Sequence, residues 1–389
     1  MSPRHRRRIL AVAIGAIALD TALLGLIAPL LPEIERRTGA SEAELGLALG
    51  AYALPILLVS LPLGRAADAI GRRPLLLSGL LLTAAGSVLI AVAGSLPPLI
   101  VGRSIQGVGS AASWIAALAL VSDLAPPDRK GEAIGFALAA NSVGAIGGPA
   151  LGGISGDAIG FEFPFLFVAG IAVGLAVAGR VVLPRQQRRA GGGPRTSVPD
   201  LIRLAASGPV LPAILSVIVG AVTLGVIDVV APLDADERLG LTAAAIGGLF
   251  AATLALDAAA APIAGRWSDR IGRVQVALLG LSLLAISLVL LAVLPGIGGF
   301  VVGLSVFGIG SSVMFASAVP WLAEAFGDLD KGFGYGFLNL IYSIGYAAGP
   351  IAAGVGLQSS GADLTYVLTA VLIVAAAVLM FLRRAAMPD

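Results

Sequence analysis

Four ionisable side chains stand inside long apolar stretches of this 389-residue sequence: Asp20, Arg103, Asp228 and Asp257. Each stretch is about twenty residues long, enough for a helix to cross a hydrocarbon core of about 30 Å. A charge at the bilayer centre costs at least about 2.5 to 3.5 kcal/mol, so such residues need a structural or functional reason. Desolvation raises the pKa of a carboxylate, and a nearby guanidinium lowers it. This combination suits a proton carrier.

An internal repeat tests whether Arg103 is needed for packing alone. Residues 102–109, GRSIQGVG, align with residues 303–310, GLSVFGIG, at an offset of 201. The glycines are kept in the second copy, whereas Arg103 becomes Leu304 and Gln106 becomes a phenylalanine. Helix packing therefore needs the glycines and not the arginine. We interpret Arg103 and Gln106 as functional, and a buried structural ion pair is the alternative for Arg103.

The carboxylates are not repeated features of the scaffold. Asp20 corresponds approximately to Thr223 in the second copy, and Asp228 corresponds approximately to Gly25 in the first. Asp20 lies near the middle of the first apolar stretch, and Asp228 lies in the outer third of its stretch. Asp257 lies toward the inner half of another stretch, where it could instead face a helix interface.

The elements that carry these residues are transmembrane helices. Hydrophobic residues make up 58% of the chain and charged residues 12%, and the mean hydropathy is +0.98. Continuous apolar runs satisfy their backbone hydrogen bonds as helices, whereas barrel strands would alternate over about ten residues. The sequence predicts an all-α membrane protein with twelve spans, near 9–31, 44–64, 74–95, 98–121, 132–155, 163–183, 209–231, 242–264, 274–294, 297–320, 333–357 and 363–382.

Basic residues predict the orientation in the membrane. They concentrate on alternate loops, starting from the arginines of MSPRHRRR, while Arg36, Arg37 and Arg238 fall on the opposite side. Because cytoplasmic loops are enriched in Lys and Arg, both termini are expected in the cytoplasm, in a plasma membrane of the bacterial inner-membrane type. The net charge of +2 reflects this bias and does not indicate a nucleic-acid partner. The first apolar run is too long for the core of a signal peptide, so we expect it to be a retained helix.

The chain divides into two halves. Residues 184–208 form the one long polar stretch, rich in Gly, Pro and Arg, and are interpreted as a cytoplasmic linker. It separates a six-helix bundle at 1–183 from another at 209–389. Parallel six-helix repeats are a known design of secondary transporters, in which the substrate binds between the halves and one half rocks against the other.

Three motifs carry a resemblance to a known family. GRAADAIGRRP at 64–74 returns in part as GRWSDRIGR at 265–273, RSIQGVGSA begins at Arg103, and the pattern G-x8-G-x3-G-P-x2-G-G begins at Gly135. Together and in this order they resemble the major facilitator superfamily along essentially the whole chain. The third motif is similar to the family's helix-five antiporter signature.

The resemblance implies roles for two further groups of residues. One group would be a conformational latch, with a topogenic turn as the alternative: Gly64, Asp68, Gly71, Arg72 and Asp123, and in the second half Asp269 and Arg273. The other would form a close-packed seam between the halves, with ordinary tight packing as the alternative: Gly135, Gly144, Gly148, Pro149, Gly152 and Gly153. The family architecture would also bring the helices of Asp20, Arg103 and Asp228 around one central cavity.

The expected function is export of a small organic compound in exchange for protons. The sequence is similar to the drug-efflux and vesicular amine branch, although Ser312 and Asn339 stand where that branch has acidic residues. The expected substrate is a cationic or neutral amphiphile; a facilitator or proton symporter for a sugar or other metabolite is the alternative. Without Cys, intramembrane His or a nucleotide-binding motif, an enzyme, a primary pump and a cofactor or metal are not expected. The partners expected are the substrate, protons and membrane lipid, with a functional monomer.

Overall fold

The structure is a computed structural model and describes residues 2–124, 130–184, 210–326 and 331–383. Nearly all of the predicted linker, 184–208, lies outside the described residues. The described residues form helices joined by short turns and contain no strand. The first half holds α1 (Pro3–Leu26), the short helix η1 (Ala28–Leu30), α2 (Leu31–Thr38), α3 (Glu42–Ala69), α4 (Arg72–Ala91), α5 (Leu96–Leu124), α6 (Lys130–Ala158) and α7 (Glu162–Val182).

The second half holds α9 (Leu211–Leu239), α10 (Ala243–Ile271), α11 (Arg273–Val293), α12 (Gly296–Phe326) and α13 (Lys331–Arg383). Helix α13 contains two spans, because its backbone breaks at Gly361 (φ 78°, ψ 173°), a conformation that favours glycine. Eleven helices in the described chain are long and apolar enough to cross a membrane. Counting α13 as two gives the predicted twelve spans and the predicted all-α fold.

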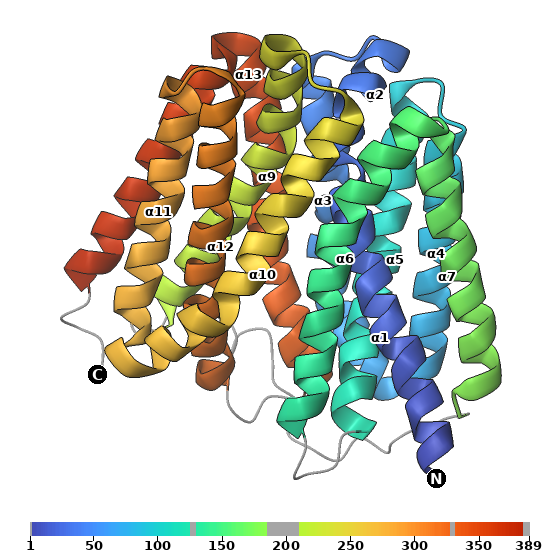
Figure 1. Ribbon diagram of the computed structural model, residues 1–389. Helices are drawn as coiled ribbons and strands as arrows, with labels where there is room; N and C mark the ends of the chain where they lie inside the picture. Colours follow the sequence, from blue (N-terminus) through green and yellow to red (C-terminus); the bar gives the residue numbers. More distant parts are fainter. Residues whose placement is uncertain (1, 125–129, 185–209, 327–330, 384–389) are drawn as a thin grey trace.

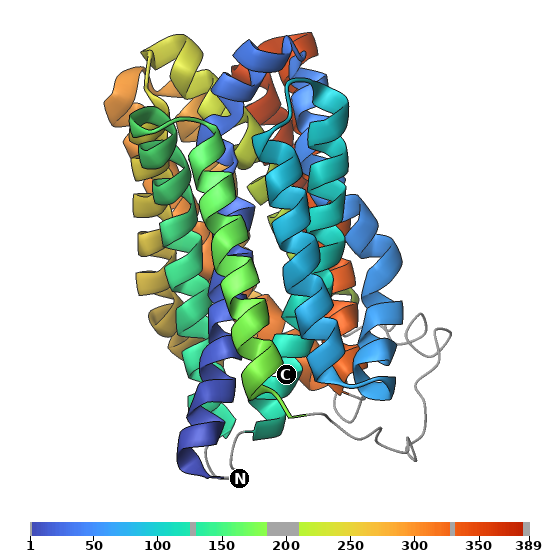
Figure 2. The same ribbon diagram turned by 90° about the vertical axis from the view of Figure 1, so that its right-hand side faces the viewer.

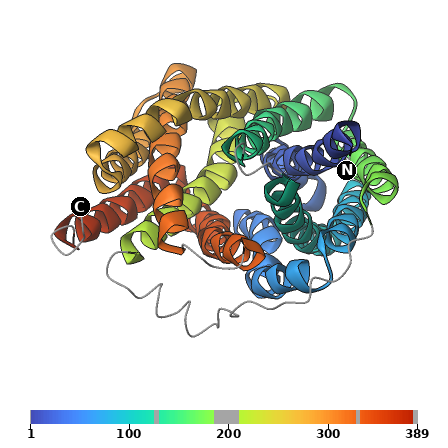
Figure 3. The same ribbon diagram turned by 90° about the horizontal axis from the view of Figure 1, so that it is seen from below.

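The helices form two groups that lie side by side. Figure 1 shows them running between two ends of the molecule, and Figure 2 shows those of the first half from the side. Viewed along the helices, the first half (blue to green) lies beside the second (yellow to red) (Figure 3). We call the end at which α1 begins and α13 finishes the proximal end, and the opposite end the distal end.

The internal repeat also appears in the turns, at the offset of 201 residues. Gly39 and Gly240 end equivalent helices at the distal end with φ of 64° and 61°. Ser41 then caps α3 within a capping box, and Thr242 caps α10 by accepting a hydrogen bond from a backbone N–H at 3.3 Å. Positive φ and side-chain caps stop and start helices at defined residues, so the repeated sequence sets repeated helix ends.

Two close-packed seams join the halves, and the repeat relates them. In the seam between α6 and α10, a Cβ added to Gly153 would lie 3.0 Å from the Cα of Gly247, which also packs on the Pro149 carbonyl. In the seam between α3 and α13, a Cβ added to Gly46 would lie 3.0 Å from the Cα of Gly354. Only glycine permits this approach of two helix backbones.

Most of the predicted glycine stripe packs elsewhere than expected. Gly144, Gly148 and Gly152 face the backbone of α1, which belongs to the same half. Gly153 and the Pro149 carbonyl, on another face of α6, touch the other half. A Cβ at Gly135 would meet no atom within 4 Å, so this residue does not extend the stripe. The expectation that the whole motif seals the two halves is therefore wrong, because a helix turns its successive faces to different neighbours.

The distal end is fastened by polar contacts between the halves. The Nη1 of Arg36 in α2 donates to both carboxylate oxygens of Asp236 in α9, at 3.2 and 2.9 Å. The Oδ2 of Asp157, near the end of α6, accepts a hydrogen bond of 2.8 Å from the Ala244 N–H in the first turn of α10. A carboxylate in this position satisfies a free N–H of the helix and its dipole. Together with the glycine seams, these contacts close the distal end.

Candidate functional site

Arg103 lies in the centre of the molecule with 0% of its surface exposed. Its Nη1 donates to the Oε1 of Gln106 at 3.1 Å, and the Nε2 of Gln106 donates to the Ser87 hydroxyl of α4 at 2.9 Å. The guanidinium also stacks over the ring of Tyr52 from α3, at 4.6 Å from the ring centre, an arrangement that stabilises a cation. Its Nε and Nη2 have no hydrogen-bond partner among the described residues.

Tyr52 connects this arginine to the first-helix carboxylate. Its hydroxyl donates a 2.6 Å hydrogen bond to the hydroxyl of Ser110, which lies seven residues after Arg103 on α5. The Ser110 hydroxyl in turn approaches the carboxyl of Asp20 on α1. Asp20 is 9% exposed, and its buried Oδ1 has no hydrogen-bond partner among the described residues. The route from Asp20 to Arg103 therefore runs through Ser110 and Tyr52.

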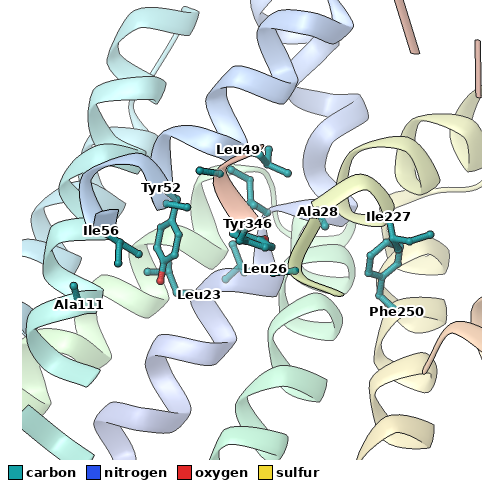
Figure 4. Close-up of a cluster of buried hydrophobic side chains, with 14 of the residues drawn as sticks. Leu23, Leu26, Ala28, Leu49, Tyr52, Ile56, Ala111, Ile227, Phe250 and Tyr346 are labelled. Atoms are coloured by element: carbon teal, nitrogen blue, oxygen red, sulfur yellow. The ribbon is translucent and has the colours of Figure 1, made fainter. Parts of the chain in front are cut away.

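Asp228 lies on the other side of Arg103. Its Oδ2 accepts a 2.7 Å hydrogen bond from the hydroxyl of Tyr346 on α13. Arg103 interacts electrostatically with both Asp228 and Tyr346. The carboxylate whose charge Arg103 meets is Asp228, and Tyr52 lies between Arg103 and the Ser110 contact of Asp20. In Figure 4, Tyr52 and Tyr346 stand among apolar side chains of neighbouring helices.

Further aromatic rings lie next to Tyr346 within the second half. Tyr342, one turn earlier on α13, stacks with Tyr346 at a centroid distance of 5.7 Å and an angle of 15°. Phe315 from α12 follows at 6.2 Å from Tyr342. The site therefore joins charged groups to a wall of flat rings.

Asp257 is not part of this group. Its backbone carbonyl accepts a 2.7 Å hydrogen bond from Ser312 of α12, and its side chain interacts with Ser311 of the same helix. These contacts lie within the second half, between α10 and α12. The structure brings Asp20, Arg103, Gln106 and Asp228 together, and it leaves Asp257 at a helix interface, which is the alternative that the sequence analysis named.

The predicted latch residues lie at the proximal turn between α3 and α4. Gly71 caps α4 with φ 96° and ψ 162°, and its repeat counterpart Gly272 has φ 99° and ψ 147°. Arg72 is 6% exposed; its Nε lies 3.4 Å from the Oδ2 of Asp123 at the end of α5, and its Nη1 donates to the Ala67 carbonyl. The expected pair between Arg72 and Asp123 is thus present.

The remaining members of the predicted latch lie in α3 and at the equivalent turn of the second half. Gly64 lies buried within α3, while the Asp68 side chain lies outside the described residues. In the second half, Asp269 is exposed and Arg273 is partly buried at the start of α11. The two halves therefore share the glycine turn, while the buried arginine at this turn belongs to the first half alone.

Sequence reasoning missed the hydroxyl groups that connect the charges. Tyr52, Tyr346, Ser87 and Ser110 were not predicted. The chain contains only five tyrosines, and a tyrosine inside an apolar helix must satisfy its hydroxyl group, so these residues carried a usable signal. Serines carried none, because they are frequent here and many bond to their own helix backbone. Among the described residues, no cluster of three potential metal ligands is present.

Comparison with known proteins agrees with this architecture. The model of the Major Facilitator Superfamily matches residues 10–233 and again 213–388. The two matches together cover nearly the whole chain, and each covers one half of it. The chain belongs to the major facilitator superfamily, a family of membrane transporters and not of enzymes.

Curated relatives include proteins named for drug resistance. The chain is 24% identical over 337 residues to Multidrug resistance protein 1 of Bacillus subtilis, covering 85% of each. It is 35% identical over 167 residues to the class E Tetracycline resistance protein of Escherichia coli, covering 42% of this chain and 41% of that protein. It is 43% identical over 98 residues to the Inner membrane transport protein YajR of Escherichia coli, covering 21% of that protein. Several of these matches span less than half of the relative.

Solved structures share the fold. A bacterial homolog of the human lysosomal transporter Spinster, in an inward-facing and unoccupied conformation, has a TM-score of 0.83 at 18% identity, with 98% of both chains covered. The human organic anion transporter MFSD10 has a TM-score of 0.70 at 19% identity, covering 98% of this chain and 100% of that chain. At such identities the likeness concerns the fold alone.

Proposed function

We propose that this transporter exports a drug-like organic compound in exchange for protons. The observation that carries the proposal is the buried charged group formed by Asp20, Arg103 and Asp228 between the two halves. A transporter that rocks around a central site exposes such groups to one side of the membrane at a time. The drug resistance named for two relatives supports the substrate class.

Coupling needs a group that can carry a proton across. In the centre of the described chain, Asp20 and Asp228 are the acidic candidates, and they come from opposite halves. A cationic or neutral amphiphile would compete with the proton at Asp20, whose Oδ1 accepts no hydrogen bond from the described protein. Arg103 provides a positive charge near Asp228, whereas Asp20 is contacted by the neutral Ser110 hydroxyl.

The orientation forms part of the proposal. We assign the proximal end to the cytoplasm and the distal end to the outside, in a bacterial-type inner membrane. The arginine bias of the loops supports this assignment. The closed distal end then corresponds to a state that is shut to the outside. Latch residues at the proximal turn would act when that end closes.

The test is uphill transport in proteoliposomes under an imposed pH gradient. Wild type, Asp20→Asn, Asp228→Asn and Asp257→Asn are compared, with ethidium as the cationic probe. Asp20→Asn fixes a neutral side chain, so it should abolish uphill transport while leaving downhill exchange measurable. Asp257→Asn should transport uphill, because its side chain faces α12.

The outcomes separate the alternatives. If Asp20→Asn still transports uphill and Asp228→Asn does not, the proton site is Asp228 on α9 and not Asp20. Uphill transport by all three variants would exclude proton antiport through these carboxylates. Accumulation of probe in the same direction as the proton flux would instead favour a symporter, the alternative named from the sequence.

A further inference from the structure

Two opposite charges in the central site have only part of their hydrogen bonds. The Nε and Nη2 atoms of Arg103 and the Oδ1 atom of Asp20 are fully buried and have no hydrogen-bond partner among the described residues. Their neighbours are satisfied: Asp228 accepts from Tyr346, and Tyr52 donates to Ser110. A buried charged group without its full set of hydrogen bonds destabilises the folded protein.

The fold itself does not require a buried charge at the position of Arg103. The described part of the chain holds no ion pair between Arg103 and a carboxylate, although the guanidinium can bind one with two parallel hydrogen bonds. At the repeat position the fold uses Leu304, which is 2% exposed. The second half is thus built without a charge at this position. The first half, in contrast, holds two guanidinium nitrogens of Arg103 and one carboxylate oxygen of Asp20 that have no hydrogen-bond partner among the described residues. We call the two nitrogens the free edge of Arg103.

The two free groups have a defined spacing. Arg103 and Ser110, the contact of Asp20, are seven residues apart on α5, which corresponds to about 10 Å along the helix. The ring of Tyr52 lies between them, over the guanidinium at one face and bonded to Ser110 at its hydroxyl. The stacked rings of Tyr342 and Tyr346 stand across the site on α13. Aromatic rings stack on flat molecules, so rings from both halves favour a planar substrate.

We propose that the substrate is an amphoteric organic molecule, whose acidic group binds the free edge of Arg103 and whose amine binds Asp20, with a planar ring system between them. This inference rests on the proposed export function and narrows its substrate class. The acidic group is planar and oxygen-bearing, such as a carboxylate, because that geometry matches two adjacent guanidinium nitrogens. Arg103 and Asp20 belong to the first half and the facing rings to the second, so movement between the halves opens the site.

Binding of three related probes to the purified full-length protein in detergent tests the proposal. Ciprofloxacin carries a carboxylate and an amine at opposite ends of a planar fused ring. Its methyl ester lacks the acid, and its N-acetyl derivative lacks the basic amine. Wild type should bind ciprofloxacin about tenfold more tightly than either derivative, because each derivative leaves one buried charge unpaired.

Site variants assign each end of the probe. Arg103→Gln should bind ciprofloxacin and its methyl ester equally while still rejecting the N-acetyl derivative, and Asp20→Asn should do the reverse. Arg103→Lys keeps the charge and guards against misfolding; it should recover part of the preference for the acid. Arg180→Gln and Asp363→Asn make the same chemical changes at exposed positions and should bind like wild type.

Three results would overturn the inference. These are equal binding of ciprofloxacin and its ester by wild type, absence of binding by all three probes, and a loss of affinity in Arg103→Gln that is the same for every probe. The last result would mean a structural arginine. Uphill export of ethidium without recognition of ciprofloxacin would leave the proposed function intact and reject only this substrate class. Selective binding of ciprofloxacin without proton-driven transport would support this substrate class and reject the proposed export in exchange for protons.

Discussion

At the scale of single residues, the central arginine is held by polar contacts from three helices. Gln106, one turn along α5, fixes one end of the guanidinium, Ser87 of α4 fixes Gln106, and Tyr52 of α3 covers one face of the guanidinium. These contacts orient Arg103 but leave two of its nitrogens open. Orientation without full pairing is what a binding or coupling group requires.

A second buried arginine has the opposite character. Arg72 pairs with Asp123 at the end of α5 and donates to the Ala67 carbonyl of α3. We expect Asp123→Asn to slow turnover about threefold to tenfold, with probe affinity changed by less than about twofold, because it alters the balance between conformations. Transport rate and equilibrium binding, measured on the same preparation, check this.

The control for this prediction is Asp363→Asn, which removes a carboxylate from an exposed ion pair with Arg238 at the distal end. It should leave both quantities near wild type, since exposed ion pairs contribute little. A large loss of affinity in a folded Asp123→Asn protein would assign the proximal pair to the binding site and reject the latch.

At the scale of helices, the sequence predicts where each helix lies in the chain better than which side of it contacts which neighbour. The apolar lengths, the repeated Gly39 and Gly240 ends and the repeated Gly71 turn all define local structure, and the predicted spans agree with the helices. Which residues meet across helices depends on the rotation of each helix and on its shift along the neighbour. Neither is encoded locally, so the hydroxyl contacts that Tyr52 and Tyr346 make across helices were not predicted.

The glycine face of α6 gives a sharp test at this scale. A Cβ on Gly148 would press into the Ala22 backbone of α1, whereas a Cβ on the adjacent Gly147 would meet nothing within 4 Å. Gly148→Ala should therefore destabilise the protein by about 1–3 kcal/mol. Gly147→Ala should be neutral or stabilising by up to about 1 kcal/mol, since alanine favours helix. Thermal unfolding in detergent measures both, and equal melting temperatures would refute the packing of α6 on α1.

At the scale of the whole molecule, a repeat of 201 residues produces two equivalent seams, Gly153 with Gly247 and Gly46 with Gly354. In transporters built from such repeats one half rocks against the other, and the two seams are equivalent places at which the halves meet. Sequence reasoning found the repeat and predicted a seam that includes Gly153, but it did not predict the partner helices or the second seam, because a glycine pattern predicts a close approach without naming the partner helix.

Orientation is a property of the whole molecule as well. The native chain has no cysteine, so single cysteines report cleanly. Ser41→Cys lies at the distal end, where Ser41 caps α3, and should react with a membrane-impermeant thiol reagent in intact cells. Ser197→Cys in the linker should react only after the cells are opened. The reverse pattern would invert the proposed topology.

Opening of the distal end is the remaining requirement for alternating access, and one ion pair makes it testable. Arg36 and Asp236 join the halves at 2.9 Å, whereas Arg37 and Glu162 form a similar pair at 2.7 Å within the first half alone. We expect a short thiol-reactive crosslinker between Arg36→Cys and Asp236→Cys to reduce transport about tenfold or more, reversibly on cleavage, because the halves cannot separate there. The same crosslinker between Arg37→Cys and Glu162→Cys should leave transport within about twofold of the uncrosslinked protein, since both residues move together. Full transport by the crosslinked 36–236 protein would mean that the distal end never opens, and rocking of the two halves would then be wrong.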